Sequence, residues 1–227
     1  MSPGETRRGT RSAERLSRDF FTRDTLTVAR ELLGCALVHA GPAGRVSGRI
    51  VEVEAYHGED DPACHAAAGR TDRTAPLYGP PGFSYVYLIY GMYHCLNVVT
   101  RAEGEPSAVL IRAIEPLEGV AIMRARRLAR RTDGRSRIPD HDLANGPGKL
   151  CQALGVTLAH NRLDLTRGSR LWIERAGNRS MGVVWSPRVG INVGSERLWR
   201  CFLEGSPYVS PSHLNRRTAI RPRPALD

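Results

Sequence analysis

The stretch SYVYLIYGMYHCLNVV, residues 84–99, holds two strand-like runs on either side of a glycine and contains no charged side chain. The runs YVYLI and YHCLNVV are rich in β-branched and aromatic residues, so the segment predicts a β-hairpin with Tyr90 and Gly91 at its tip. Because side chains alternate along a strand, Tyr85 and Tyr87 share one face. Two interpretations stay open: a core hairpin with tyrosine hydroxyls at its rim, or a wedge with an aromatic tip.

Outside this hairpin, strand signals outnumber helix signals. Helices are predicted from Asp24 or Thr25 to Gly34, across 115–131 with Pro116 in the first turn, and between Pro147 and Gly155. Strands are predicted at 36–40, 48–56, 84–90, 93–100, 107–113, 170–175 and 189–193. Strands that cluster without a helix between each favour an α+β fold, a single mixed domain on a largely antiparallel sheet from which the hairpin protrudes.

The length and composition fit one folded domain with basic ends. At 227 residues, 41% of them hydrophobic, the chain is long enough for a single sizeable core. Residues 1–17 are predicted to form a disordered basic arm, 18–212 the folded domain, 130–142 a flexible basic loop within it, and 213–227 a tail. No apolar run approaches the roughly 20 residues of a membrane helix. With no secretory signal either, we expect an intracellular protein, cytoplasmic or associated with the nucleoid, without membrane contact.

The charge balance indicates an acidic partner. The 33 basic residues exceed the 23 acidic ones and give a net charge of +10. All the basic residues except Lys149 are arginine, whose planar guanidinium grips phosphate with two hydrogen bonds. Nucleic acid is the favoured partner, and charge alone leaves a membrane surface open. The five cysteines include no C-x-x-C pair, which is typical of buried thiols rather than of disulfides or a metal centre.

A second informative segment is GRIVEVEAYHGEDDPACHAAAGR, residues 48–70. On a strand through 50–56, Glu52, Glu54 and Tyr56 fall on one face, and the valines and alanine between them form the natural core face. The carboxylates would then be solvated, but a glutamate close to Tyr56 and His65 also fits a general base in an aromatic pocket. The His, Asp and Cys residues of this segment match no metal-binding motif, so we expect no metal site.

Seven segments, taken in order, point to one known family. They are GRIVEVEAY, HAAAGR, SYVYLIYGMYHCLNVV, AVLIRAIEPLEG, LANGPGKLCQALG, RVGIN and EGSPYVS. Together they resemble the alkyladenine (3-methyladenine, or methylpurine) DNA glycosylase family, from about residue 17 to residue 210. The resemblance implies a domain that inserts its hairpin into the minor groove of double-stranded DNA, flips out a damaged purine nucleotide and hydrolyses the N-glycosidic bond.

The resemblance also implies roles for individual residues. Tyr90 matches the inserted wedge, and Asn97 matches a steric barrier to the exocyclic amino group of guanine. Glu54 matches the catalytic glutamate that activates a water. Arg112 matches a supporting arginine beside that glutamate, with a structural ion pair as its simpler interpretation. The aromatic walls of the base pocket are matched by Tyr56, His65 and Tyr87.

We therefore expect a monofunctional glycosylase of base excision repair that acts on alkylated or deaminated purines, such as hypoxanthine, and leaves an abasic site. Strand cleavage generally needs an amine nucleophile, and only Lys149 and the N-terminal amine could supply one. We expect a monomer that needs neither a metal nor a nucleotide cofactor. The alternative is a non-catalytic binder of damaged or distorted nucleic acid. The alanines of HAAAGR and His94 depart from the expected pattern and bear on the range of lesions.

Overall fold

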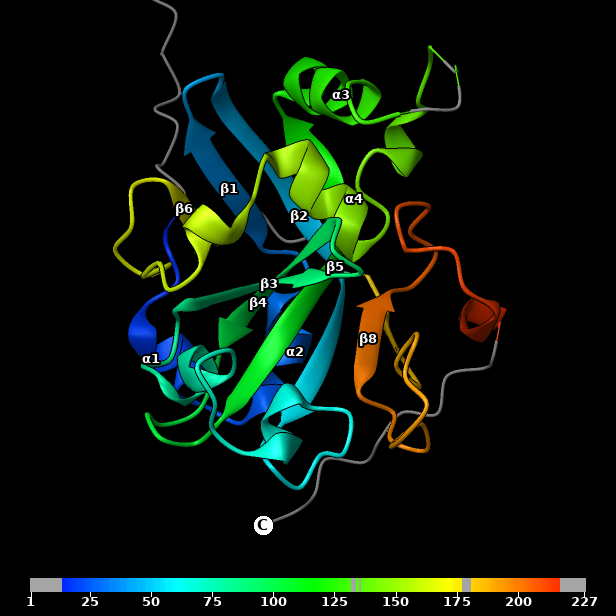
Figure 1. The fold of residues 1–227 in the computed structure, drawn as a ribbon. Helices are drawn as coiled ribbons and strands as arrows, with labels where there is room; N and C mark the ends of the chain where they lie inside the picture. Colours follow the sequence, from blue (N-terminus) through cyan, green and yellow to red (C-terminus); the bar gives the residue numbers. More distant parts are fainter. Residues whose placement is uncertain (1–13, 132–133, 135, 177–180, 217–227) are drawn as a thin grey trace, which may run out of the picture.

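The computed structural model describes residues 14–131, 134, 136–176 and 181–216, whose strands form one curled sheet with helices packed around it (Figure 1). The strands are β1 (Ala36–Gly41), β2 (Gly44–His57), β3 (Ser84–Ile89), β4 (Tyr93–Val99), β5 (Ser107–Glu118), β6 (Leu171–Glu174), β7 (Val183–Ser186) and β8 (Arg200–Leu203). The α-helices are α1 (Arg18–Phe21), α2 (Thr25–Leu32), α3 (Val120–Leu128) and α4 (Pro147–Leu154). Short 3₁₀ helices are η1 (His65–Ala68), η2 (Ala75–Tyr78), η3 (Asp140–Asp142), η4 (Leu158–His160) and η5 (His213–Arg216).

The strand β2 is the one around which the sheet is built. The strand order is β3-β4-β5-β2-β1-β6, and β8 pairs with both β2 and β7. The pairings are antiparallel, and β2 pairs with β5 along one edge and with β1 and then β8 along the other. The predicted α+β class, a single mixed domain on a largely antiparallel sheet, is therefore confirmed.

The register between β2 and β5 shifts twice near the middle of β2. The first shift, between Ile50 and Glu52, leaves Val51 of β2 without an opposed residue on β5. The second shift, between Glu52 and Val53, leaves Arg112 of β5 without an opposed residue on β2. Such bulges bend a strand and re-aim its side chains.

The carboxylate face of β2 is buried, although the sequence left it open whether Glu52 and Glu54 would be solvated. It is buried because β8 and the segment after it cover this part of β2.

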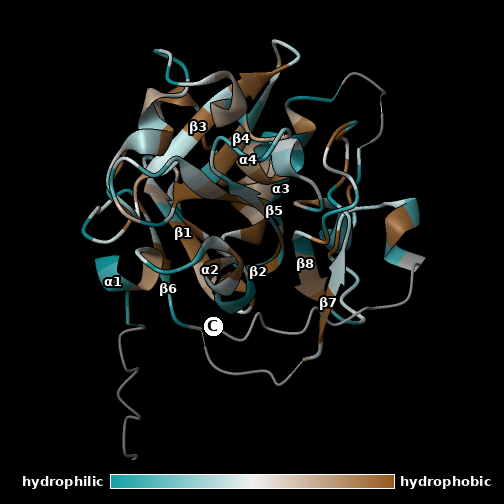
Figure 2. Ribbon diagram, turned by 90° about the horizontal axis from the view of Figure 1, so that it is seen from below, coloured by the Kyte–Doolittle hydropathy of each residue, from teal (hydrophilic) through white to brown (hydrophobic). Residues whose placement is uncertain are grey.

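The main core lies between the sheet and the helices α2 and α4, which bury their apolar faces against it. In Figure 2, hydrophobic segments gather on the strands around α2, and the peripheral loops are largely hydrophilic. The Asp24 side chain accepts hydrogen bonds from the N–H groups of Leu26 and Thr27, both at 3.0 Å, which fixes the start of α2 where the sequence predicts it. The predicted helix between Pro147 and Gly155 is also confirmed. The helical core residues are Val28, Ala29 and Leu32 of α2 and Leu150, Cys151, Ala153 and Leu154 of α4.

The helix predicted across 115–131 starts later than expected. Pro116 lies in β5, which continues to Glu118, and α3 begins at Val120 after Gly119. Proline is tolerated there because β4 pairs with β5 only at residues 108–110, so the far edge of β5 at Pro116 has no β4 partner that would need its missing N–H.

The strand predicted at 189–193 is wrong, and two short strands were missed. Residues 189–193 form bends instead, and the first three of them, Val189, Gly190 and Ile191, line the cavity described below. The missed strands β7 and β8 have four residues each, too few to show an alternating pattern. Both pair with each other, and β8 adds to β2.

The N-terminal end of the described part runs along the sheet. Residues 14–17, at the end of the predicted basic arm, lie along β6, where Leu16 is buried and its N–H donates to the Ile173 carbonyl at 3.0 Å. Residues 1–13 of that arm, 132–133 and 135 of the predicted loop, and 217–227 of the tail lie outside the described residues. Within the described part, none of the helices combines the length and the apolar character that crossing a membrane requires.

We expect Gly119→Ala to destabilise the fold at the junction of β5 and α3. Gly119 has a φ of +69°, and a Cβ there would lie 2.6 Å from the Arg45 carbonyl oxygen. The variant should lose about 2–3 kcal/mol of unfolding free energy in urea titration, from the clash together with the strain of a left-handed residue. The control Gly104→Ala has a φ of +94° and no atom within 4 Å of the added Cβ. It should lose only about 1 kcal/mol, and equal losses would show that the clash relaxes without cost.

Candidate active site

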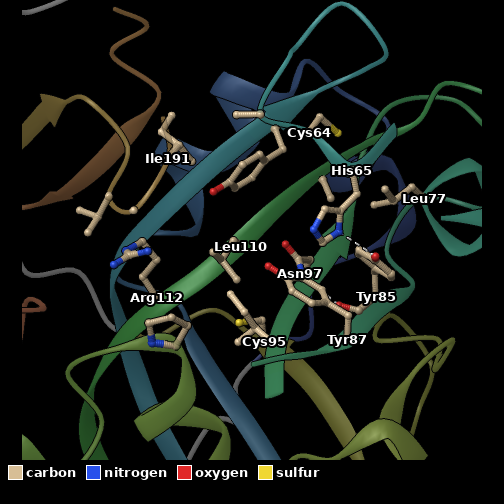
Figure 3. A pocket seen from close by; sticks show the side chains of 17 residues that line it. Cys64, His65, Leu77, Tyr85, Tyr87, Cys95, Asn97, Leu110, Arg112 and Ile191 are labelled. Carbon is tan, nitrogen blue, oxygen red and sulfur yellow. Dashed lines mark hydrogen bonds between the residues drawn. The ribbon is translucent and has the colours of Figure 1, made fainter. Parts of the chain in front are cut away.

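A cavity of about 270 Å³ opens where strands β2, β3, β4 and β5 meet η1, the start of α4 and the loop after β7 (Figure 3). Its wall is mostly aromatic and aliphatic, with one amide and one guanidinium group. Most of the predicted site residues meet on this wall, although they come from distant parts of the chain. They are Tyr56, His65, Tyr87, Asn97 and Arg112.

An aromatic cluster of His65, Tyr85 and Tyr87 forms one side of the cavity. The His65 and Tyr87 rings lie edge to face with their centroids 4.6 Å apart, and the Tyr85 and Tyr87 centroids are 5.3 Å apart. His65 Nδ1 and the Tyr85 hydroxyl share a hydrogen bond of 2.9 Å, drawn dashed in Figure 3. Burial, together with the nearby charge of Arg73, lowers the pKa of His65. The ring is therefore neutral at neutral pH and presents no charge that would repel a cationic ligand.

Tyr56 adds a further aromatic wall and links the cavity to a buried carboxylate. Its hydroxyl donates to Glu54 Oε2 at 2.9 Å. The pKa of Tyr56 is raised well above its usual value by burial and by the negative charge of Glu54. The phenol therefore stays protonated and remains a hydrogen-bond donor to the carboxylate.

Glu54 is fully buried behind Tyr56 and Arg112, both of which line the cavity. Its Oε1 accepts the backbone N–H of Val189 at 2.7 Å. Its Oε2 accepts the Tyr56 hydroxyl and, at 3.3 Å, Arg112 Nη1. These donors come from β2, β5 and the loop after β7, so three separate elements fix the position of one carboxylate.

Arg112 is the charged member of the cavity wall. Burial opposes its charge, but the carboxylates of Glu54 and Glu52 outweigh burial and raise its pKa. Its Nε donates to Glu52 Oε1 at 2.8 Å. The simpler interpretation of Arg112 as part of an ion pair therefore holds, and the same guanidinium also borders the cavity.

Asn97 is held rigidly where β4 lies between its two neighbouring strands. It is opposite Tyr85 on β3 and Leu110 on β5. The side-chain Nδ2 donates to the Tyr85 backbone carbonyl at 3.0 Å. Because the side chain is almost completely buried and its amide is anchored, it cannot swing away from an incoming group without breaking that bond.

Tyr90 stands apart from the cavity at the turn between β3 and β4. It is 82% exposed, and its φ of +52° is unusual for a residue other than glycine. Gly91 follows with a φ of +68°, and the Met92 N–H donates to the Ile89 carbonyl at 3.2 Å. Positive φ at both central residues is the pattern of the turns that suit β-hairpins.

Sequence reasoning missed the loop after β7 and its buried anchor, Arg188. The Arg188 guanidinium donates to both oxygens of Asp61, at 2.5 and 2.7 Å, and to the Ala55 carbonyl at 3.0 Å. It also lies over the Tyr56 ring, 4.7 Å from the centroid. The pair holds the loop so that the Val189 N–H reaches Glu54. The sequence predicted a strand at 189–193 and used RVGIN only for the family resemblance, and neither interpretation assigned a role to Arg188.

Tyr85 was also missed, although its shared face with Tyr87 was a usable signal. Among residues 14–131, 134, 136–176 and 181–216, no group of three or more His, Cys, Asp or Glu side chains is arranged to hold a metal ion.

Comparison with known proteins gives one consistent match. Residues 19–207 match the family model described as methylpurine-DNA glycosylase (MPG). The chain is 48% identical over 200 residues to a protein of Clostridium acetobutylicum, covering 86% of this chain and 97% of that one. It is 50% identical over 198 residues to a protein of Methanocella arvoryzae, covering 86% and 95%, and 48% identical over 201 residues to one of Desulfitobacterium hafniense, covering 87% and 98%. Each relative is provisionally named 3-methyladenine DNA glycosylase.

We expect Asp61→Asn to destabilise the protein by about 3 kcal/mol at pH 7, because it leaves the Arg188 guanidinium buried without its carboxylate. Burial opposes the ionisation of Asp61, but the hydrogen bonds and charge of Arg188 outweigh it, so the pKa of Asp61 is lowered. The stabilisation is therefore present above the unfolded-state pKa of about 3.9 and is lost as the pH falls through the folded-state pKa. Urea unfolding of both proteins at pH 7 and at pH 3 measures this.

The control is Asp164→Asn, which breaks the half-exposed Arg18–Asp164 pair. It should cost no more than about 1 kcal/mol. If Asp61→Asn cost no more than this control, or if its deficit were undiminished at pH 3, the Arg188 pair would not be what stabilises the loop.

Proposed function

Because the chain belongs to the methylpurine-DNA glycosylase family and is a 3-methyladenine DNA glycosylase, we propose that it flips alkylated or deaminated purines out of duplex DNA. It then hydrolyses their N-glycosidic bond with a water that is activated at Glu54. The observation that carries this proposal is the position of Glu54. A fully buried carboxylate, fixed by three donors, lies directly behind an aromatic cavity. No observation favours the alternative of a non-catalytic binder, which would have no use for this carboxylate.

The flipped base occupies the aromatic cavity in this proposal. Tyr56, His65 and Tyr87 would stack on the flat purine. An alkylated purine is electron-poor and often cationic, so the electron-rich faces of the tyrosines attract it, and neutral His65 does not repel it. Stacking tolerates several lesions, which agrees with a range that includes hypoxanthine.

The proposed chemical step uses one water and side chains of the protein, without a cofactor. Glu54 takes a proton from the water, whose oxygen attacks the anomeric carbon, C1′, while the bond from C1′ to the base nitrogen breaks and its electron pair leaves with the base. The negative charge of Glu54 stabilises the positive charge that develops on the sugar. Arg112 and Tyr56 supply the hydrogen bonds that orient the carboxylate.

Tyr90 serves as the wedge in this proposal. A large aromatic side chain that is 82% exposed and held at positive φ is costly for stability alone. Inserted from the minor groove, the ring would fill the gap left by the flipped nucleotide and replace part of the lost stacking. The tip of the β3–β4 pair is free to project in this way.

Asn97 and Lys149 bear on which bases are excised and on whether the DNA strand is cut. The anchored amide of Asn97 would meet the exocyclic amino group of a normal guanine and reject it. The Lys149 ammonium donates to Asn145 Oδ1 at 2.7 Å. Lys149 is not among the residues that line the cavity, which supports a monofunctional enzyme that leaves an abasic site. We further propose that the enzyme acts as a monomer on chromosomal DNA inside the cell, without a cofactor.

We expect Glu54→Gln to retain binding of lesion DNA and to lose base release by a factor of about 10² to 10⁴, the usual contribution of a general base. Single-turnover release of 3-methyladenine or hypoxanthine from duplex DNA in the presence of EDTA measures this. Glu118→Gln, at an exposed ion pair with Arg45 on the far end of β5, is the matched control and should release base at the normal rate. Unchanged release by Glu54→Gln would move the base to another residue.

Replacing Tyr90 by serine should weaken binding to lesion DNA by about tenfold to a hundredfold, because a stacked aromatic contributes about 1–3 kcal/mol. Base release should fall with it, and the melting temperature should not. Leu158, 50% exposed on η4, supplies the control Leu158→Ser, which should leave DNA binding unchanged. A Tyr90→Ser protein that fails to fold would instead support the core-hairpin interpretation.

A further inference from the structure

We propose that Glu52 is a positioning residue for the reaction: it holds Arg112 beside the cavity and prevents that guanidinium from pairing fully with Glu54. This inference rests on the proposed role of Glu54 as the base that activates water. It concerns a residue two positions before Glu54 on the same buried face of β2.

The first argument is the number of donors that converge on Glu52. Its Oε1 accepts from Arg112 Nε at 2.8 Å, from Arg200 Nε at 2.7 Å and from the Ser210 hydroxyl at 2.8 Å. Its Oε2 accepts the Ser210 N–H at 2.7 Å. Burial opposes the ionisation of Glu52, but Arg112 and Arg200 outweigh it and lower the pKa. Glu52 is therefore a fixed negative charge at neutral pH, although its side chain is fully buried.

The second argument is that Glu52 and Glu54 share the Arg112 guanidinium unequally. Arg112 gives Glu52 a contact of 2.8 Å from Nε and gives Glu54 a contact of 3.3 Å from Nη1. The shorter bond goes to the carboxylate that lies farther from the chemistry. Glu54 Oε2 keeps the Tyr56 hydroxyl at 2.9 Å as its shorter partner. A close bidentate pair with an arginine would occupy both oxygens of a carboxylate, and the single contact of 3.3 Å shows that Glu54 is not in such a pair.

The third argument is charge balance. Glu52 and Glu54 offset Arg112 and Arg200 in one buried group. Without Glu52, Arg112 would lose its shorter carboxylate contact and would be drawn to Glu54 as its remaining ion-pair partner in the group. The pair would then form the close, bidentate contact that arginine favours with carboxylates, and Glu54 would become a weaker base.

The segment after β8 completes this arrangement. Ser210 supplies two of the donors to Glu52, and Asn215 Oδ1 accepts Arg200 Nη2 at 2.7 Å. Asn215 Nδ2 donates back to the Ser210 carbonyl at 2.9 Å. These residues lie beyond 207, where the match to the family model ends, and they hold Glu52 and Arg200 in place.

Several titratable or charged groups surround Glu54, and a change in its basicity must be judged against all of them. They are Glu52 and Tyr56 on β2, Tyr87 on β3, Cys95 on β4, Arg112 on β5, Arg200 on β8, and Arg188 on the loop after β7. Among these, Glu52 is the carboxylate that shares an arginine with Glu54.

The test compares the pH dependence of single-turnover base release in two double variants. Glu52→Gln/Arg200→Gln removes one charge of each sign, so the buried group stays neutral. We expect it to fold and to bind lesion DNA normally. Its rate should rise at a lower pH than that of the wild type, and its plateau should fall by up to about tenfold, because one pKa unit lost by a base costs at most one factor of ten in rate. Arg49→Gln/Glu115→Gln removes another cross-strand pair between β2 and β5 and should leave the pH profile unchanged.

The outcomes separate this inference from the proposed function. If Glu54→Gln still releases base, the role of Glu54 fails whatever the double variant does. If Glu54→Gln is inactive and the Glu52 double variant keeps the wild-type midpoint, Glu52 is only structural and the inference is overturned. Should that double variant not unfold cooperatively, Glu52→Asp keeps the charge with a shorter reach. It should show a smaller shift in the same direction, and a wild-type midpoint in Glu52→Asp would also overturn the inference.

Discussion

The buried group of Glu52, Glu54, Arg112 and Arg200 is the interaction on which the rest of the site depends. Four charges taken out of water would cost several kcal/mol each unless they were paired and hydrogen bonded. The double register shift between β2 and β5 accompanies this pairing, because it leaves Arg112 without a cross-strand partner, between Ala113 opposite Glu52 and Ile111 opposite Val53. From there its guanidinium contacts both glutamates. A regular ladder would give Arg112 a direct cross-strand partner and fix its side chain by ordinary alternation.

The elements around β2 hold its two glutamates in place beside the cavity. β2 pairs on both edges, so it is held in place while β8 and residue 210 close over its carboxylate face. The loop after β7 is anchored by the Arg188–Asp61 pair, and its Val189 N–H donates to Glu54. The groups that hold Glu54 thus come from several elements, and the loss of any one of them leaves a buried polar group without its partner.

The sequence patterns predicted the antiparallel sheet, the paired strands β3 and β4, and the helices at Thr25 and Pro147. These elements follow from local periodicity and from capping residues, which a pattern reports directly. Whether the face of Glu52 and Glu54 is solvated was not predictable in this way, since it depends on β8, a strand of four residues. The start of α3 was predicted too early because Pro116 was assigned to the first turn of the helix. A proline fits the first turn of a helix as well as the unpaired edge of a strand. The residues themselves suggested a general base near Tyr56 and His65 and a wedge at Tyr90, each as one of two interpretations, and the resemblance to a family assigned the roles of all the site residues.

In the proposed function, the cavity separates recognition of the base from reaction, and the two rely on different physics. Aromatic faces bind flat purines with little discrimination, because every base has a face to stack. Discrimination must therefore act at the edge of the base, where the Asn97 amide is anchored to the Tyr85 carbonyl. The proposed reaction, in contrast, would depend on the ion pairs of Glu52 and Glu54 with Arg112 and Arg200, which are formed behind the wall without any ligand. A site of this kind can accept many lesions and still reject a normal base by a single rigid amide, without any change in the buried charges that would act on the sugar.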